Sequence, residues 1–118
     1  LLSDGKDESS RFSFDDTLKY ARRAGVAIYA IGLDYEKAAR ADRKRLAQLA
    51  QETGGRSFFI DSADGLASIY QEIQQELRSR YYLAYQPSAA GDRETFRTID
   101  VEIERSGLEA KTERGYYP

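Results

Sequence analysis

The run that decides the fold is Val26-Ala27-Ile28-Tyr29-Ala30-Ile31. A continuous apolar run of this length predicts a strand that is buried on both faces, as in a parallel sheet covered by helices. A second short run of the same kind is Ser57-Phe58-Phe59-Ile60. We therefore expect strands near 26–32 and 56–60 to be parallel neighbours.

Three helix patterns alternate with these runs. The first begins near Phe14, where Ser13 and Asp16 have the spacing of a capping box, and it ends at Gly25. The second covers roughly 42–53 and has one apolar stripe, made of Leu46, Leu49, Ala50 and Thr53. The third covers about 64–78, with a stripe of Leu66, Ile69, Tyr70, Ile73 and Leu77. Alternating strands and helices predict an α/β fold with a doubly wound, Rossmann-like parallel sheet.

At the N-terminus, Leu1-Leu2 has the character of the end of another buried strand. The sequence has no initiator methionine and no segment that leads into that strand. We therefore expect the chain to begin inside a domain and to form a partial domain. Asp4 follows the strand, and open α/β sheets place ligand sites at the carboxyl edge. The plainer alternative for Asp4 is an ordinary Asp-Gly turn. Asp7 and Glu8 are interpreted as a solvated acidic loop, with outer-shell metal ligation as the alternative.

After Arg80 the pattern changes. Tyr81-Tyr82-Leu83-Ala84-Tyr85 predicts a strand, and residues 96–114 predict an antiparallel hairpin with Ser106-Gly107 as its turn. In that register Glu102 faces Lys111, a favourable pair, whereas Glu104 faces Glu109. The tyrosines of this region are expected to cover the sheet with their rings, namely Tyr81, Tyr82, Tyr85, Tyr116 and Tyr117. We therefore divide the chain into 1–80, an α/β part, and 81–118, an antiparallel β extension.

Composition excludes several functions. The 118 residues carry a net charge of −2, which gives no global attraction to nucleic acid or to an anionic membrane. No apolar run approaches the roughly 20 residues that a membrane span needs. The chain has neither cysteine nor histidine, which excludes a Ser-His-Asp triad, a Cys-His pair and an ordinary zinc site within it. A basic cluster is better explained as a solvated helix face than as a nucleic-acid site, and it comprises Lys37, Arg40, Arg43, Lys44 and Arg45.

The series of segments over about residues 1–80 resembles the second half of a von Willebrand factor type A domain. The segments that carry the resemblance are 1–5, Gly25 to Gly32, Leu46 to Gly55, and Asp64 to Ile73. The tail resembles an extension of bacterial von Willebrand factor type A-related proteins, through Tyr82-Leu83-Ala84-Tyr85-Gln86-Pro87, Arg97-Thr98-Ile99-Asp100-Val101 and Arg114-Gly115-Tyr116-Tyr117.

The resemblance implies a metal-ion-dependent adhesion site at the carboxyl edge of the sheet. It assigns Asp4 as one ligand of Mg²⁺ or a similar divalent cation, and the other ligands belong to segments that this sequence lacks. Such a cation takes about six oxygens, so we expect the fragment itself to hold no cofactor. The implied function of the intact domain is non-catalytic binding of a protein ligand, whose identity is unknown. The resemblance favours a secreted or cell-envelope location.

Two other functions stay open at this point. One is a fragment of a doubly wound enzyme, a hydrolase or a nucleotide-dependent protein, whose catalytic loop lies upstream. The other is a structural domain with a decayed metal site. For the fragment we also expect a homodimer, because the resemblance places a missing strand beside Leu2 and a bare interior edge pairs readily with another chain.

Overall fold

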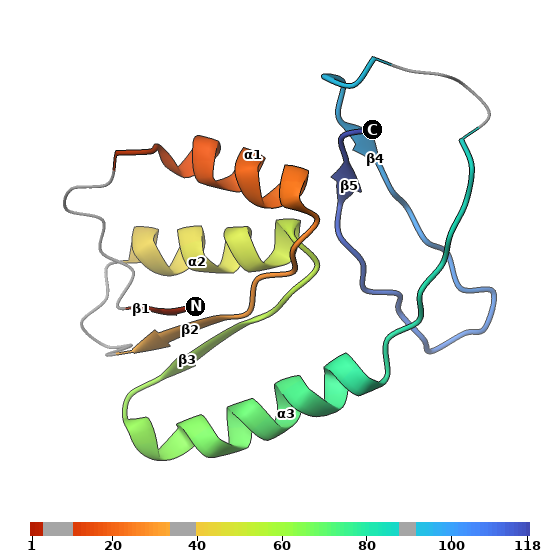
Figure 1. Cartoon of the computed structure of the whole chain (residues 1–118). Coiled ribbons are helices and arrows are strands. Elements are labelled where there is room, and N and C mark those ends of the chain that lie inside the picture. Colours follow the sequence, from red (N-terminus) through yellow and green to blue (C-terminus); the bar gives the residue numbers. More distant parts are fainter. Residues whose placement is uncertain (4–10, 34–39, 88–91) are drawn as a thin grey trace.

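The computed structural model describes residues 1–3, 11–33, 40–87 and 92–118. In this part of the chain, three parallel strands form one sheet in the order β1 (Leu2–Ser3), β2 (Ala30–Leu33) and β3 (Ser57–Ile60). Figure 1 shows α1 (Phe14–Ala24) and α2 (Arg40–Glu52) on one side of the sheet and α3 (Leu66–Arg78) on the other. A short 3₁₀ turn, η1 (Ala63–Gly65), precedes α3. A separate antiparallel pair joins β4 (Arg97–Thr98) to β5 (Gly115–Tyr116). The expected α/β class and the parallel pairing of β2 with β3 are confirmed.

Helix α1 has the ends that its sequence predicts. The Ser13 hydroxyl accepts a hydrogen bond from the Asp16 amide at 3.1 Å, and the Asp16 carboxylate accepts one from the Ser13 amide at 3.2 Å. At the other end Gly25 adopts φ 61°, and its N–H bonds back to the carbonyls of Ala21 and Arg22. Both caps act within a few residues of the chain, so local sequence is sufficient to place them.

Strand β2 is shorter than the apolar run that predicts it. Residues 26–29 approach the strand without joining the ladder, and Val26 is half exposed. The Ile28 amide donates instead to the hydroxyl of buried Thr53 at 3.0 Å, and that hydroxyl donates to the Leu49 carbonyl at 2.8 Å. Thr53 therefore connects the end of α2 to the approach of β2, and the ladder begins only at Ala30.

The core lies between α2 and the sheet. Leu46 and Ala50 of α2 pack on Ala30 of β2, with Phe59 of β3 against them. The stripe predicted for α2 is confirmed, because Leu46, Leu49, Ala50 and Thr53 are all buried.

Helix α3 is covered less completely than its apolar stripe predicts. Ile69 is buried, whereas Tyr70 and Leu77 of the same stripe are 59% and 48% exposed. A sheet of three short strands is narrow, so it covers only part of the helix face. None of the described helices is long and apolar enough to cross a bilayer.

The C-terminal hairpin is only partly formed. Ser106-Gly107 makes the expected turn, with φ 81° at Gly107. Arg97 lies opposite Tyr116, which is the register that a turn at Ser106-Gly107 predicts. The Ile99 amide donates a hydrogen bond to the Arg114 carbonyl at 2.9 Å. Between this point and the turn the two limbs separate. The expected Glu102–Lys111 pair was wrong, because Lys111 forms its ion pair with Glu76 of α3 at 2.9 Å.

The strand expected at Tyr81–Tyr85 was also wrong. These residues form no strand, and the rings of Tyr81 and Tyr82 are 91% and 95% exposed, so they cover no sheet. Tyr116 and Tyr117 are half-buried, and they contact Tyr85 and Phe96 by ring edges or tilted rings. A strand needs a partner, and no described residue supplies one here. The proposed boundary at residue 80 stays a prediction.

Candidate functional site

The carboxyl edge of the sheet is the site that the sequence predicts. Ser3, Leu33 and Ile60 end three parallel strands, so they lie at one edge. Asp4, the predicted metal ligand, lies outside the described residues, as do Asp7 and Glu8. Asp61, which follows β3, is exposed. Among the described residues no three side chains of the metal-binding types come together.

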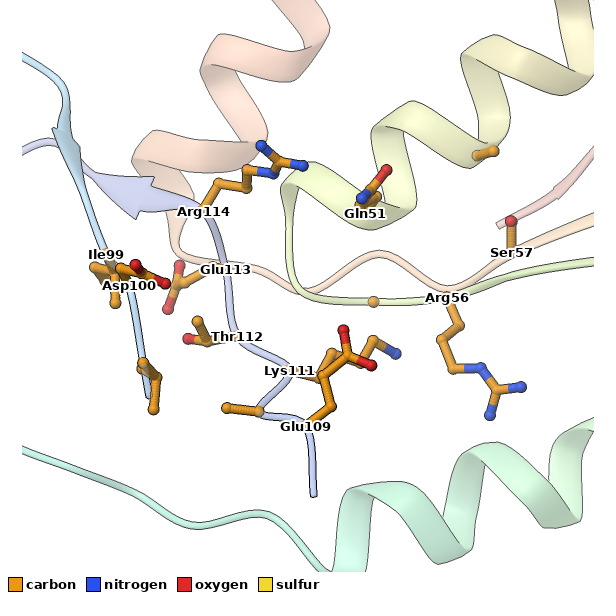
Figure 2. Close-up of a pocket in the computed structure, with 14 residues that line it drawn as sticks. Gln51, Arg56, Ser57, Ile99, Asp100, Glu109, Lys111, Thr112, Glu113 and Arg114 are labelled. Atoms are coloured by element: carbon orange, nitrogen blue, oxygen red, sulfur yellow. The ribbon is translucent and has the colours of Figure 1, made fainter. Parts of the chain in front are cut away.

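A cleft of about 550 Å³ lies at the other end of β3 (Figure 2). Its walls are the start of β3, the last turns of α2, and the two separated limbs of the hairpin. Figure 2 shows Arg56 and Ser57 on one side, Asp100 and Ile99 on the other, and the limb from Glu109 to Arg114 between them. Because the strands are parallel, this cleft and the edge that follows Ser3 lie at opposite ends of the sheet.

The cations that line the cleft are all paired. Arg56 contacts Glu72 at 2.5 Å and Glu76 at 3.4 Å, and Lys111 contacts Glu76. Arg114 lies 3.9 Å from Glu52, which also pairs with Arg22 of α1. By contrast, three acidic side chains in the wall have no ion pair within the described part of the chain, namely Asp100, Glu109 and Glu113. The cleft thus presents carboxylates as its available charged groups.

Glu76 is the centre of the contacts beside the cleft. It accepts hydrogen bonds from the Tyr29 hydroxyl and from Lys111, both at 2.9 Å, and a longer one from Arg56. Arg80 donates to the Tyr29 hydroxyl at 2.7 Å and to the Gly54 carbonyl at 3.0 Å. These contacts join α3, the approach to β2, the start of β3 and the hairpin, so they fix the hairpin against the α/β part.

The same contacts shift the pKa values of Glu76 and Tyr29. Burial opposes ionisation of Glu76, but hydrogen bonds from Lys111 and Tyr29 outweigh it, so its pKa lies below the ordinary 4.5. Burial, together with the hydrogen bond to Glu76, raises the pKa of Tyr29 above 10.0. Glu76 is therefore stabilised in its ionised form, and Tyr29 is stabilised as the neutral phenol.

We expect Glu76→Gln to lower the free energy of unfolding by about 1 kcal/mol near neutral pH, because the amide keeps the shape and loses the charge. A pKa that is lower in the folded state stabilises the fold above the unfolded value, and this contribution disappears as pH falls through the folded value. The difference between wild type and variant should therefore vanish in acid, below the ordinary 4.5. Urea unfolding across this range measures it.

Glu72→Gln is the matched control, because among the described residues Glu72 forms an ion pair with Arg56 only, and its side chain is half exposed. It should change stability less than Glu76→Gln at every pH. A Glu76→Gln deficit that stayed constant into acid would show that ionisation of Glu76 does not stabilise the hairpin contact.

The basic cluster that the sequence analysis identified shows no sign of a binding role among the described residues. Arg43 of the basic cluster lies over the Phe59 ring at 5.1 Å, whereas Arg40, Lys44 and Arg45 are exposed and Lys37 lies outside the described residues. The absence of a nucleic-acid function stays a prediction. No local sequence pattern predicted the cleft. One related signal is that Glu72 and Glu76 are like charges one helical turn apart, an arrangement that nearby cations stabilise.

No family model, no curated protein and no solved structure matches this chain. The resemblance to von Willebrand factor type A domains therefore stays a prediction from the sequence.

Proposed function

We propose that this chain is part of a non-catalytic protein-binding module of the von Willebrand factor type A kind. The observation that supports the proposal best is the sequential order of three parallel strands, β1, β2 and β3. This order suits one half of a doubly wound, Rossmann-like sheet, and we propose that the described sheet is such a half. Strand β1 is at its edge, where a further central strand of an intact domain would pair.

The proposed site is the carboxyl edge that follows β1. Parallel strands expose successive loops there, and open α/β sheets use that edge for ligands. Asp4 would supply one oxygen to Mg²⁺ or a similar cation, with the rest of the shell from other parts of the intact domain and a carboxylate from the partner protein. Residues of the chain position the cation and make or break no covalent bond.

For the 118-residue chain we expect no saturable Mg²⁺ or Mn²⁺ binding below about 1 mM, because one carboxylate leaves most of a six-oxygen shell to water. Isothermal titration with each metal measures this. In the intact domain, Asp4→Ala should weaken metal-dependent partner binding about tenfold or more.

Asp61→Ala is the control, since Asp61 is exposed at the same edge of the sheet, after the end of β3, and is assigned no metal. Tight, stoichiometric metal binding by the 118-residue chain that Asp4→Ala abolishes would overturn the proposal of a divided site. It would show a site built locally from Asp4, Asp7 and Glu8.

We also propose that the 118-residue chain forms a two-fold dimer. Leu1 and Leu2 are 60% and 48% exposed, and β1 pairs with β2 on one side only within the described residues. An open edge and exposed leucines favour association between copies. Light scattering at several concentrations tests this. A chain that stays at 13.4 kDa at high concentration contradicts it.

A further inference from the structure

The segment Tyr81–Tyr85 is an apolar strand sequence that the structure leaves without a partner. The exposed fractions of Tyr81, Tyr82, Leu83 and Tyr85 are 91%, 95%, 80% and 63%. Figure 1 shows the chain running on from α3 through this segment as an extended trace. Residues 81–85 make no backbone hydrogen bond to another described residue. An uncharged, aromatic, unpaired segment of this kind is a template for pairing with another strand.

The order of the side chains in the Tyr81–Tyr85 segment indicates which strand this segment would pair with. Tyr81, Leu83 and Tyr85 alternate along the chain, so an extended segment places them on one face. The pattern Tyr-x-Leu-x-Tyr is the same in both directions about Leu83. In an antiparallel pair centred on Leu83, two copies of the segment would place Tyr81 opposite Tyr85 twice and Leu83 opposite itself. Aromatic residues directly opposite one another are favourable cross-strand pairs.

We propose that two copies of this chain associate through their Tyr81–Tyr85 segments, as an antiparallel strand pair with its two-fold axis at Leu83. This proposal rests on the dimer proposed above and assigns its interface to this segment in place of β1. The face that carries Tyr81, Leu83 and Tyr85 would bring four tyrosine rings of two copies together, and their side chains offer more exposed surface than the β1 edge. Strand β1 offers two residues, of which Leu2 is already half covered.

One end of the segment is already held in place. The ring of Tyr85 meets Tyr116 of β5 edge-on, with 6.2 Å between ring centroids. This contact connects the segment to the antiparallel pair of β4 and β5. The interface would therefore continue into the hairpin of each copy instead of resting on a free linker.

Engineered cysteines test the register directly, because the chain has no cysteine of its own. In the proposed pair the two Leu83 Cα atoms lie about 4.5–5.5 Å apart, within the range of a disulfide. Leu83→Cys should therefore form a disulfide-linked dimer under mild oxidation at least about tenfold faster than Leu108→Cys. Leu108 is an equally apolar residue, 57% exposed in the hairpin, and serves as the control. Leu2→Cys tests whether two copies associate through the β1 edge instead. Non-reducing electrophoresis measures all three variants.

A second variant measures the energetics without cysteine chemistry. Leu83→Lys would place two ammonium groups opposite each other at the axis, so it should raise the dimer dissociation constant at least about tenfold. Leu108→Lys should leave that constant unchanged, and circular dichroism checks that both variants fold.

The outcomes separate the two proposals. A dimer by light scattering with fastest cross-linking at Leu2, or with equal rates at all three positions, overturns the Leu83 axis and leaves the dimer intact. A monomer with slow cross-linking at every position overturns both. A monomer in which the amides of 81–85 are protected from hydrogen exchange would show that this segment pairs within its own chain.

Discussion

Gly55→Ala should unfold the chain or destabilise it by about 3 kcal/mol or more, although it adds a single methyl group. A Cβ at this position would stand 1.9 Å from the Ile28 carbonyl oxygen and 2.5 Å from its carbon. Both are backbone atoms, and the Ile28 amide is held by Thr53, so the strand approach cannot move aside without losing that bond. Urea unfolding followed by circular dichroism measures the effect.

The matched control is Gly65→Ala at the start of α3. There the nearest heavy atom to a new Cβ is the Ile60 Cγ2 at 3.4 Å, and the Gly65 backbone has the helical φ of −76°. We expect this variant to match or slightly exceed wild type, because alanine loses less backbone entropy than glycine on folding. Equal stability of the Gly55→Ala and Gly65→Ala variants would contradict the close packing of Gly55 on Ile28.

Leu46→Ala should lower the free energy of unfolding by about 2–5 kcal/mol, through lost burial and the cavity that it leaves. Leu46 is 9% exposed and packs with Ala30, Ala50 and Phe59, where two of the three neighbours are alanines too small to fill the space. For a chain of this size, such a loss is a large part of the total stability. Urea unfolding by circular dichroism measures it.

Leu77→Ala is the control for this prediction, since Leu77 is also in a helix but 48% exposed. It should cost less than about 1 kcal/mol. If both substitutions cost the same, the core is not centred on the contact between α2 and the sheet.

Local signals predicted the elements that depend on nearby residues. The capping box of Ser13 and the stop at Gly25 placed both ends of α1, and the stripe of α2 identified the face that became the core. The apolar runs at 26–31 and 57–60 correctly predicted parallel neighbours, although β2 starts later than expected because Thr53 takes the Ile28 amide.

Contacts between distant segments could not be predicted in this way. Lys111 pairs with Glu76, thirty-five residues away, instead of with Glu102 across the hairpin. The role of Asp4 as a metal ligand is predicted from the sequence alone, since Asp4 lies outside the described residues. The cleft was missed because its walls come from α2, β3 and the hairpin, and no local pattern records that these meet.

The sequence by itself therefore determined the helices, the parallel neighbours and the stripe that packs against them. These follow from hydrogen bonds and side-chain periodicity within a few residues or one apolar run. Only the tertiary structure decided that Tyr81–Tyr85 is exposed, that the hairpin opens beyond Ile99, and that Glu76 connects α3 to three other segments. A strand needs a second strand to hydrogen-bond with, and a charged side chain is stabilised by a nearby opposite charge. Tertiary packing determines which segments supply these partners, and they are often far away along the chain.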